Sequence, residues 1–301
     1  METFFSRHTK TLDIDNPTRE MLWKKRLIAV HYPHHYCEGG TKQLLDEDNG
    51  SCNPDDYAGR AAQIMRTLNK LSENGGYVCA EYHGYHSCMV GKVESGTEIK
   101  RVIGHWGSNA GLDGRTAVLK ALPLQKVELV KPQDYAVIFV GRPRHWTLSR
   151  WPSARNIIEN IVEKRESAPN LENLSSEQQE ILCSEYMRLP EAENAGLPHM
   201  ANLLLPVGRT MRDLDILGVD VVGTRIFAQV TYLSLREAQN KLRRMSQYKD
   251  EIESHLVLFC KHDKVEVVEG VLVFPIEKAF EEFCSTFYGK NWLHHVVGAT
   301  G

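Results

Sequence analysis

Residues 213–232, DLDILGVDVVGTRIFAQVTY, place three aspartates on a stretch that is otherwise apolar enough to form a buried β-hairpin. Burying an unpaired carboxylate is costly. A fold that contains this hairpin must therefore give its aspartates turns to cap, arginines to pair with, or a cation to bind. The segment VGTR forms the predicted turn between the two strands. The hairpin predicts a domain built around a sheet, and it is the first candidate for a functional site.

Alternation of side chains along a strand puts Phe227, Gln229 and Thr231 on one face of the second strand. Asp215 or Asp220 on the first strand can converge with Gln229, and the sequence does not fix the register that decides between them. Carboxylate and amide oxygens suit hard cations such as Mg²⁺ or Mn²⁺, which keep waters and substrate phosphates as further ligands. This set of donors predicts metal-assisted hydrolysis of a phosphodiester bond.

The hairpin resembles the core of the PD-(D/E)XK nuclease superfamily, and most closely its Mrr-like restriction endonuclease branch, over about residues 175–287. That branch carries GxD on the first strand and Gln-X-Lys on the second, where this chain has LDILGVDVVG and AQVT. The resemblance implies that Asp215, or alternatively Asp220, is the metal-binding aspartate and that Gln229 is the second ligand. The 14 residues from Asp215 to Gln229 suit the superfamily better than the nine from Asp220. Glu185 matches the acidic residue that members often carry on the preceding helix.

The chain departs from the family where Thr231 occupies the position of the lysine. That lysine stabilises the charge that develops on phosphorus, and a hydroxyl group cannot supply a positive charge. Members of the superfamily sometimes recruit a base from a neighbouring helix, and three residues near the hairpin are candidates for this role: Lys241, Arg236 and Arg209.

Three functions stay open. The first is a Mg²⁺- or Mn²⁺-dependent endonuclease that acts on double-stranded DNA; the resemblance adds dependence on base modification and a role in defence against foreign DNA. The second is a subunit that binds nucleic acid or a partner without cleaving. The third is an unrelated α/β domain, in which the aspartates cap turns or pair with Arg212 and Arg225. A homodimer or a partner subunit is compatible with the first two.

The first half of the chain is predicted to be β-rich, with strands over 26–33, 117–130 and 135–143 and a hairpin at 77–96. A helix is predicted over 56–76, because apolar residues recur at helical spacing (Ala61, Ile64, Met65, Leu68 and Leu71) and a pair of glycines follows the last turn as a stop signal. Short strands joined by glycine-containing turns predict a small barrel or a curved sheet. The segment GGYVCAEYHGYHSCMVGKV resembles the PUA-like and PWWP-like barrels that precede the nuclease in modification-dependent restriction enzymes. Aromatic residues at such a barrel mouth can stack on a flipped base. The candidates, each of which is equally compatible with a half-buried barrel position, are Tyr82, Tyr85, Trp106 and Trp146.

The segment GRPRHWTLSRWPSAR at 141–155 interleaves arginines with two tryptophans. Arginine beside an aromatic side chain is a usual composition for contact with phosphate and base. A domain boundary with cation–π packing would have the same composition. The residues expected to contact nucleic acid here are Arg142, Arg144, Trp146 and Arg150, with Arg155 adjacent.

These patterns divide the chain into a β-rich recognition domain at 1–150, a linker at 151–174 with a helix over 153–164, and a nuclease-like domain at 175–301. In the last domain we expect helices over 175–188 and 234–252, a strand at 255–261, and a strand leading into a helix at 270–287. Ser175 and Gln178 form a capping-box pattern at the start of the first helix. The predicted fold class is α/β, or α+β overall, with a barrel-like first domain and a mixed central sheet in the second.

Composition limits the cellular context. The formal net charge of −3 over 301 residues gives no overall positive field, although one face can still be basic. Seven scattered cysteines favour a reducing compartment over a disulfide framework. The charged N-terminal segment and the lack of an apolar run of about 18 residues predict a cytoplasmic protein without a membrane span. The histidines and cysteines at 31–37 and 79–88 lack common zinc spacings, so we expect no zinc site.

Overall fold

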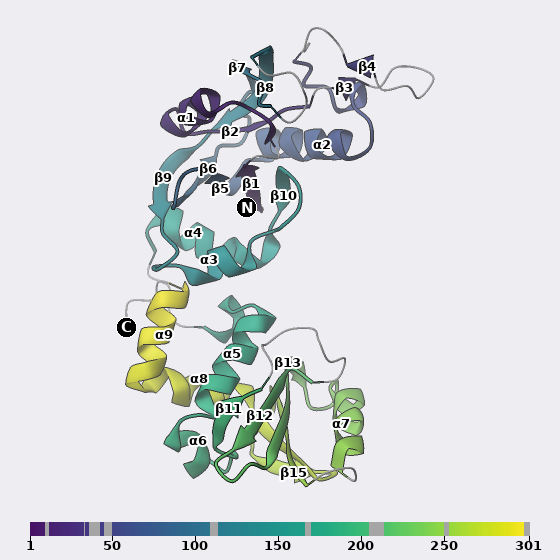
Figure 1. Ribbon diagram of the computed structural model, residues 1–301, viewed down its shortest axis with the longest axis vertical. Helices are drawn as coiled ribbons and strands as arrows, with labels where there is room; N and C mark the ends of the chain where they lie inside the picture. The colour runs from purple at the N-terminus through teal and green to yellow at the C-terminus, as the bar shows by residue number, and fades with distance from the viewer. Residues whose placement is uncertain are drawn as a thin grey trace. The chain divides into compact units, whose positions relative to one another are not determined.

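The computed structural model describes residues 1–9, 12–32, 34–35, 43–44, 50–108, 114–165, 170–204, 214–249 and 253–297 (Figure 1). The chain forms two compact units, Met1–Ser167 and Ala168–Ala299. Among the described residues, no helix is both long and apolar enough to cross a membrane.

The first unit contains two main sheets. The five-stranded sheet has the order β10-β1-β5-β6-β9 and is antiparallel except for the parallel pair of β1 and β5. Its strands are β1 (Thr3–His8), β5 (Gly76–Tyr82), β6 (Cys88–Val93), β9 (Gln125–Val130) and β10 (Leu148–Arg150). The second, antiparallel sheet consists of β2 (Leu27–Val30), β8 (Thr116–Pro123) and β7 (Lys100–His105), and a short pair joins β3 (His34–His35) to β4 (Gln43–Leu44).

The described helices of the first unit are α1 (Asn16–Lys24), α2 (Gly59–Asn74), α3 (Ala136–Gly141) and α4 (Arg155–Glu163). Helix α1 packs on β2, α2 on β10, and α4 on β5, β6 and β9. The apolar face of α2 buries Ile64, Met65, Leu68 and Leu71, as its helical spacing predicted. The helix ends at Gly75, whose φ of +68° favours glycine. A Cβ there would also lie 2.7 Å from the backbone of Val93 and Ser95, so the glycine stop is both conformational and steric.

Two predictions for the first half need correction. The described strands form open sheets and no closed barrel, because β10 and β9 lie at opposite edges and do not pair. The apolar run predicted as a strand over 135–143 is helix α3 instead. A short apolar run does not distinguish a strand from a buried helix. Here the carbonyl oxygen of Lys131 accepts hydrogen bonds from the N–H groups of Asp134 and Tyr135, and this turn leads directly into the helix. The predicted hairpin at 77–96 is confirmed as β5 and β6, joined through Gly84.

Helix α4 lies in the first unit, where it packs against β5, β6 and β9. Its sequence is the one assigned to the linker at 151–174. Ile157, Ile158 and Val162 are buried, and this apolar stripe explains why the helix docks on the sheet rather than bridging two domains.

The second unit has a six-stranded mixed sheet with the order β11-β12-β13-β14-β16-β15. Strands β11 to β13 are antiparallel neighbours, β13, β14 and β16 run parallel, and β15 is antiparallel to β16. A mixed central sheet is what the sequence predicted. The strands are β11 (Met200–Leu203), β12 (Ile216–Asp220), β13 (Arg225–Ser234), β14 (Ser254–Lys261), β15 (Glu266–Val268) and β16 (Val271–Pro275).

Helices cover both faces of this sheet (Figure 1). Helix α7 (Gln239–Ser246) packs on one face through Leu242 and Met245, which share a core with Phe227. Helices α5 (Ser176–Tyr186) and α8 (Ile276–Ser285) pack against each other and the other face. Two further helices are α6 (Pro190–Asn194) and α9 (Phe287–Val297). The capping box predicted at the start of α5 is present, with reciprocal bonds between Ser175 and Gln178.

Candidate functional site

The hairpin of β12 and β13 brings Asp215 beside Gln229. Asp215 directly precedes β12, and its backbone N–H donates to the carbonyl oxygen of Ala228 at 3.0 Å. Its carboxylate Oδ2 accepts a hydrogen bond from the backbone N–H of Val230 at 2.8 Å. Ala228 and Val230 flank Gln229 in the sequence, so these two bonds hold the Asp215 carboxylate alongside it.

Gln229 carries a buried oxygen without a partner. The residue is 7% exposed. Its Oε1 atom is buried and has no hydrogen-bond partner in the described part of the chain. Gln229 is two residues from Phe227 and therefore lies on the same face of β13, the face covered by α7. Buried polar atoms are nearly always bonded. Gln229 Oε1 is one of several buried atoms that lack a partner among the described residues, and it is the one that lies beside the Asp215 carboxylate.

The environment of Asp215 changes its acidity. Burial raises the pKa of the Asp215 carboxyl, while the N–H of Val230 and the positive charge of Lys241 act in the opposite direction. Lys241 lies in the first turn of α7, which places its ammonium group within electrostatic reach of Asp215. Of the three cations suggested as substitutes for the family lysine, Lys241 is the one linked to Asp215. Arg236 is exposed, and Arg209, like Arg212, lies outside the described residues.

Asp220 occupies the other end of β12 and caps a turn. Its Oδ1 accepts from the N–H groups of Val222 and Thr224 at 2.9 and 2.8 Å, and its Oδ2 lies 3.1 Å from Nε2 of His255. The register, with Val219 opposite Arg225, puts Asp220 at the tip of the hairpin and away from Gln229. The alternative in which Asp220 is the metal-binding aspartate beside Gln229 is therefore wrong, because this carboxylate accepts hydrogen bonds from the backbone of the turn.

Glu185 is not linked to Asp215 by any hydrogen bond or ion pair of the described residues. Its carboxylate pairs instead with Arg188, three residues later in the sequence, at 3.5 Å. Glu180 is the acid of α5 that shares an environment with Asp215. Burial raises the pKa of the Cys183 thiol well above its ordinary range, and the charges of Glu180 and Asp215 add to this effect. The spacing of three residues between Glu180 and Cys183 was visible in the sequence, but the side of α5 that faces Asp215 was not.

Thr231 lies on the same face of β13 as Gln229 and is 8% exposed. Its hydroxyl accepts a hydrogen bond from the N–H of Leu233 at 3.4 Å. No positive charge enters the site at this position.

The described residues contain no group of three or more His, Cys, Asp and Glu side chains able to hold a metal ion. A site of one carboxylate and one amide oxygen still fits Mg²⁺, which commonly takes one or two carboxylates and completes its shell with water and substrate phosphate. It does not fit a structural zinc ion, which requires four nitrogen or sulfur ligands.

An open depression of about 920 Å³ lies at the carboxyl ends of β13 and β14 and does not include Asp215 or Gln229. The residues that line it are Ser234, Leu235, Arg236, Gln239, Lys261, His262, Asp263 and Glu277, of which only Leu235 has an apolar side chain. Opposite charges balance here, so the depression has no evident preference for an anion or a cation.

Two of the aromatic residues expected to stack on a base are interior residues. Tyr82 is 1% exposed, its hydroxyl donates to the carbonyl oxygen of Leu27 at 2.7 Å, and its ring stacks on His8. Trp106 is 4% exposed and packs against His31. Neither ring is open to a base in this structure. The prediction that both are surface stacking groups is therefore wrong. They are core residues, because the two sheets pack around them.

The other two aromatic candidates are half-buried. Tyr85 stacks on Trp23 with ring centroids 4.0 Å apart. The guanidinium group of Arg60 lies over the Trp146 ring at 5.4 Å. Both rings pack against the core of the first unit while keeping one part exposed.

The predicted arginines of the first unit differ in their partners. Arg142 Nη1 lies 3.0 Å from Glu81 Oε1. Arg150 pairs with Glu2. Arg144 is exposed, and its guanidinium group has no hydrogen-bond or ion-pair partner among the residues that the structure describes.

The chain matches no protein-family model, no curated protein and no solved structure. The features that bear on its function are thus its own side chains: the pair of Asp215 and Gln229, the nearby charge of Lys241, and the arginines of the first unit.

Proposed function

We propose that the second unit is a divalent-metal-dependent endonuclease acting on double-stranded DNA, with Asp215 and Gln229 as ligands of Mg²⁺ or Mn²⁺. The observation that carries this proposal is the buried, unpartnered Oε1 of Gln229 beside the Asp215 carboxylate. Leaving a polar atom buried without a partner costs about 1–3 kcal/mol. A bound cation would offset this cost, and a hard cation prefers this pair of oxygens.

Each residue of the site has a role in this proposal. When bound, the metal would supply an activated water and partial neutralisation of the phosphate charge. Val230 orients the Asp215 carboxylate through its N–H group. Lys241, whose charge already acts on Asp215, would stabilise the negative charge that develops on the phosphate, the work that Thr231 cannot do. Glu180 would supply the acidic group that the resemblance placed at Glu185.

The test is cleavage of plasmid DNA, unmodified and cytosine-modified, with Mg²⁺ or Mn²⁺. We expect Asp215→Asn to abolish cleavage. Asp220→Asn is the matched control, because it makes the same change in charge and shape on the same strand while an amide oxygen can still cap the turn. Cleavage by Asp215→Asn at the wild-type rate would contradict the proposal. A preference for modified DNA would support the modification-dependent form of the function and a role in defence.

A second function is supported by Thr231, which leaves the family's lysine position without a charge. In this alternative the second unit is a non-catalytic domain that binds DNA or a partner. The same experiment separates the two functions: the alternative predicts DNA binding with no product under any metal, and equal behaviour of the Asp215→Asn and wild-type proteins.

A further inference from the structure

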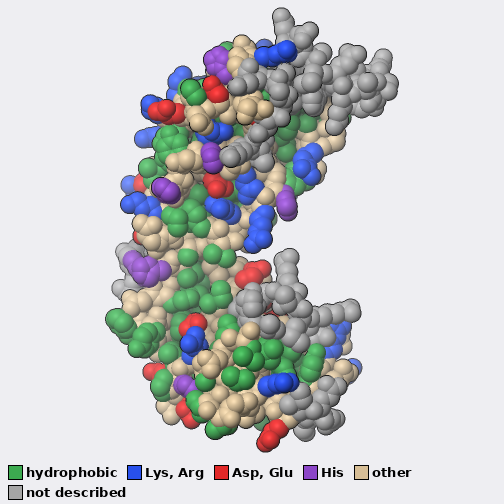
Figure 2. Space-filling view, viewed as in Figure 1, with side chains coloured by type: hydrophobic (Ala, Val, Ile, Leu, Met, Phe, Trp, Pro, Cys, Tyr) green, Lys and Arg blue, Asp and Glu red, His purple; other side chains and the backbone are tan. Residues whose placement is uncertain are grey.

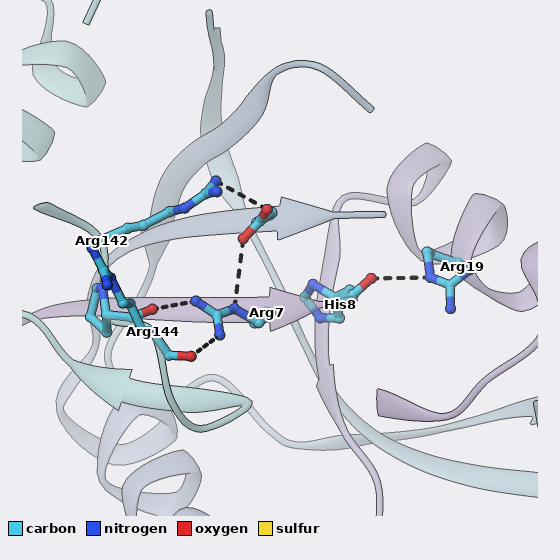
Figure 3. Close-up of polar contacts among 7 residues, drawn as sticks. Arg7, His8, Arg19, Arg142 and Arg144 are labelled. Atoms are coloured by element: carbon cyan, nitrogen blue, oxygen red, sulfur yellow. Dashed lines mark hydrogen bonds and ion pairs between the residues drawn. The ribbon is translucent and has the colours of Figure 1, made fainter. Parts of the chain in front are cut away.

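The loop at residues 142–147 of the first unit is held by a half-buried arginine on strand β1. Arg7 lies on β1 opposite Glu81 on β5. Its guanidinium group donates to the carbonyl oxygens of Pro143 and Arg144 (Figure 3). Its Nε atom lies 3.7 Å from the Glu81 carboxylate, and only 15% of the Arg7 side chain is exposed. Two backbone carbonyls in the middle of the loop are thereby fixed to the sheet.

Both ends of the loop are fixed as well. At the start, Arg142 pairs with the same Glu81 carboxylate that contacts Arg7. At the end, the carbonyl oxygen of Thr147 accepts from the N–H of Arg7 at 2.8 Å. The Thr147 hydroxyl lies 2.7 Å from the hydroxyl of Tyr32. The loop therefore has contacts to the sheet at its beginning, middle and end.

The backbone conformation of Trp146 indicates that the surroundings hold the loop in one conformation. Its φ of +79° lies in the left-handed region, which non-glycine residues rarely adopt. Such a conformation persists only where the surroundings enforce it. Here the ring packs against the core of the first unit, and Arg60 lies over it. The backbone on either side of Arg144 is thus prearranged before any ligand binds.

The loop presents an unpaired positive charge on this rigid support. Arg144 and His145 are both exposed, and neither side chain has a hydrogen bond or ion pair within the described ranges. The neighbouring Arg142 and Arg150 are each paired with a glutamate. Arg60, over Trp146, brings a second exposed guanidinium group to the same loop.

The charge of the first unit differs from that of the second. Residues 1–167 contain 23 Lys and Arg against 20 Asp and Glu, and residues 168–301 contain 13 against 19. Figure 2 shows lysine and arginine side chains spread over the visible face of the first unit, with acidic side chains scattered among them. A polyanion would therefore be attracted to the first unit rather than to the second.

We propose that the 142–147 loop is a preformed contact for a backbone phosphate of DNA, with the Arg144 guanidinium as the binding group. This inference rests on the proposed function, which makes DNA the substrate. A guanidinium group matches two phosphate oxygens with parallel hydrogen bonds. Because the loop is already ordered, binding costs little additional backbone entropy. The contact reads no base, so its contribution is independent of DNA sequence.

The test measures binding of a short fluorescent DNA duplex by anisotropy, without divalent metal, between about 50 and 200 mM NaCl. We expect Arg144→Gln to lower the affinity roughly tenfold, the equivalent of one charge-assisted hydrogen bond. The slope of log K against log salt concentration should decrease by about 0.9, one phosphate contact. Arg144→Lys should restore most of the slope and only part of the affinity, because lysine lacks the two-pronged geometry.

Arg66→Gln is the matched control, since it removes the same charge from an exposed arginine of the first unit that already has an acidic partner, Asp55. We expect it to change the affinity less than about twofold. Wild-type affinity and slope in Arg144→Gln, an equal loss in Arg66→Gln, or no DNA binding by the wild-type protein would each overturn the inference. Binding is measured without metal, so a failure of the nuclease proposal appears separately as DNA that is bound through Arg144 and not cleaved.

Discussion

The carboxylate of Asp215 accepts a hydrogen bond from the backbone N–H of Val230 at 2.8 Å, and this bond joins the start of β12 to the centre of β13. It uses one carboxylate oxygen, Oδ2, in holding the side chain next to Gln229. The same pairing also explains why a partly buried acid is tolerated here, since a hydrogen bond and the charge of Lys241 partly compensate for its burial.

Gln229→Met should stabilise the metal-free protein. The substitution replaces a buried amide whose oxygen is unbonded with an apolar side chain of similar length. We expect the free energy of unfolding, measured with urea, to rise by about 1 kcal/mol. Added Mg²⁺ should stabilise the wild-type protein and leave the variant unchanged. Gln239→Met is the control, because its amide donates to the carbonyl oxygen of Leu235 and its loss should be destabilising. Destabilisation by Gln229→Met would indicate that its oxygen is already satisfied.

As the pH is lowered, metal-dependent activity should be lost at a higher pH than it would be if the ligand were an exposed aspartate. Burial raises the pKa of Asp215, and the protonated form, which dominates below the pKa, cannot bind a cation. The activity should therefore rise with pH as the carboxyl ionises. The measurement is the pH dependence of kcat/KM at a fixed Mg²⁺ concentration below saturation, and an acid limb at the position of an ordinary aspartate would contradict this assignment.

Lys241→Met should move that acid limb to still higher pH, because it removes a positive charge that favours the ionised form of Asp215. It should also reduce the maximal rate roughly 10²–10³-fold if the ammonium group stabilises charge on the phosphate. Lys278→Met, on α8 and paired with Glu282, is the control and should change neither quantity. A lower rate without a shift in the pH profile would separate a role toward the phosphate from an effect on Asp215.

Asp220→Ala should weaken the β12–β13 turn without removing the site. Partial burial acts to raise the pKa of Asp220, but the bonds from Thr224, His255 and Val222 outweigh it and leave the pKa below its ordinary value. The stabilising effect of this carboxylate is therefore present above the pKa of the unfolded chain and is lost as the pH falls through the lower, folded value. We expect a lower urea midpoint than wild type at neutral pH and a smaller difference in strong acid. Asp220→Asn should retain most of the wild-type midpoint at neutral pH.

Ser175→Ala should destabilise the second unit by about 1 kcal/mol, because it removes the side-chain oxygen that caps α5. Ser176→Ala, one residue later on an exposed position, should have little effect. Equal midpoints for the two variants in urea would show that the cap contributes nothing to stability.

Local patterns predicted the parts of the fold that are locally determined. The capping box of α5, the glycine stop of α2 and the alternation of β13 each depend on residues within a few positions of one another. The helix at 136–141 was missed because its apolar run fits a strand as well as a buried helix.

The site was only partly predictable for the same reason. Asp215 and Gln229 were named from the pattern of the hairpin, but choosing Asp215 over Asp220 required the register of the two strands. Preferring Glu180 to Glu185 required the orientation of α5. The burial of Tyr82 and Trp106 depends on how two sheets pack, and their own neighbours in the sequence do not report it.

Strand β1 lies between β5 and β10, so its hydrogen-bonding partners come from residues 77–82 and 148–150. During synthesis on a ribosome, β1 can form hydrogen bonds along its second edge only after residues 148–150 have been synthesised. Such long-range pairing slows folding. The arginine that anchors the 142–147 loop is on this strand, so the ordering of that loop should be among the last events in the maturation of the first unit.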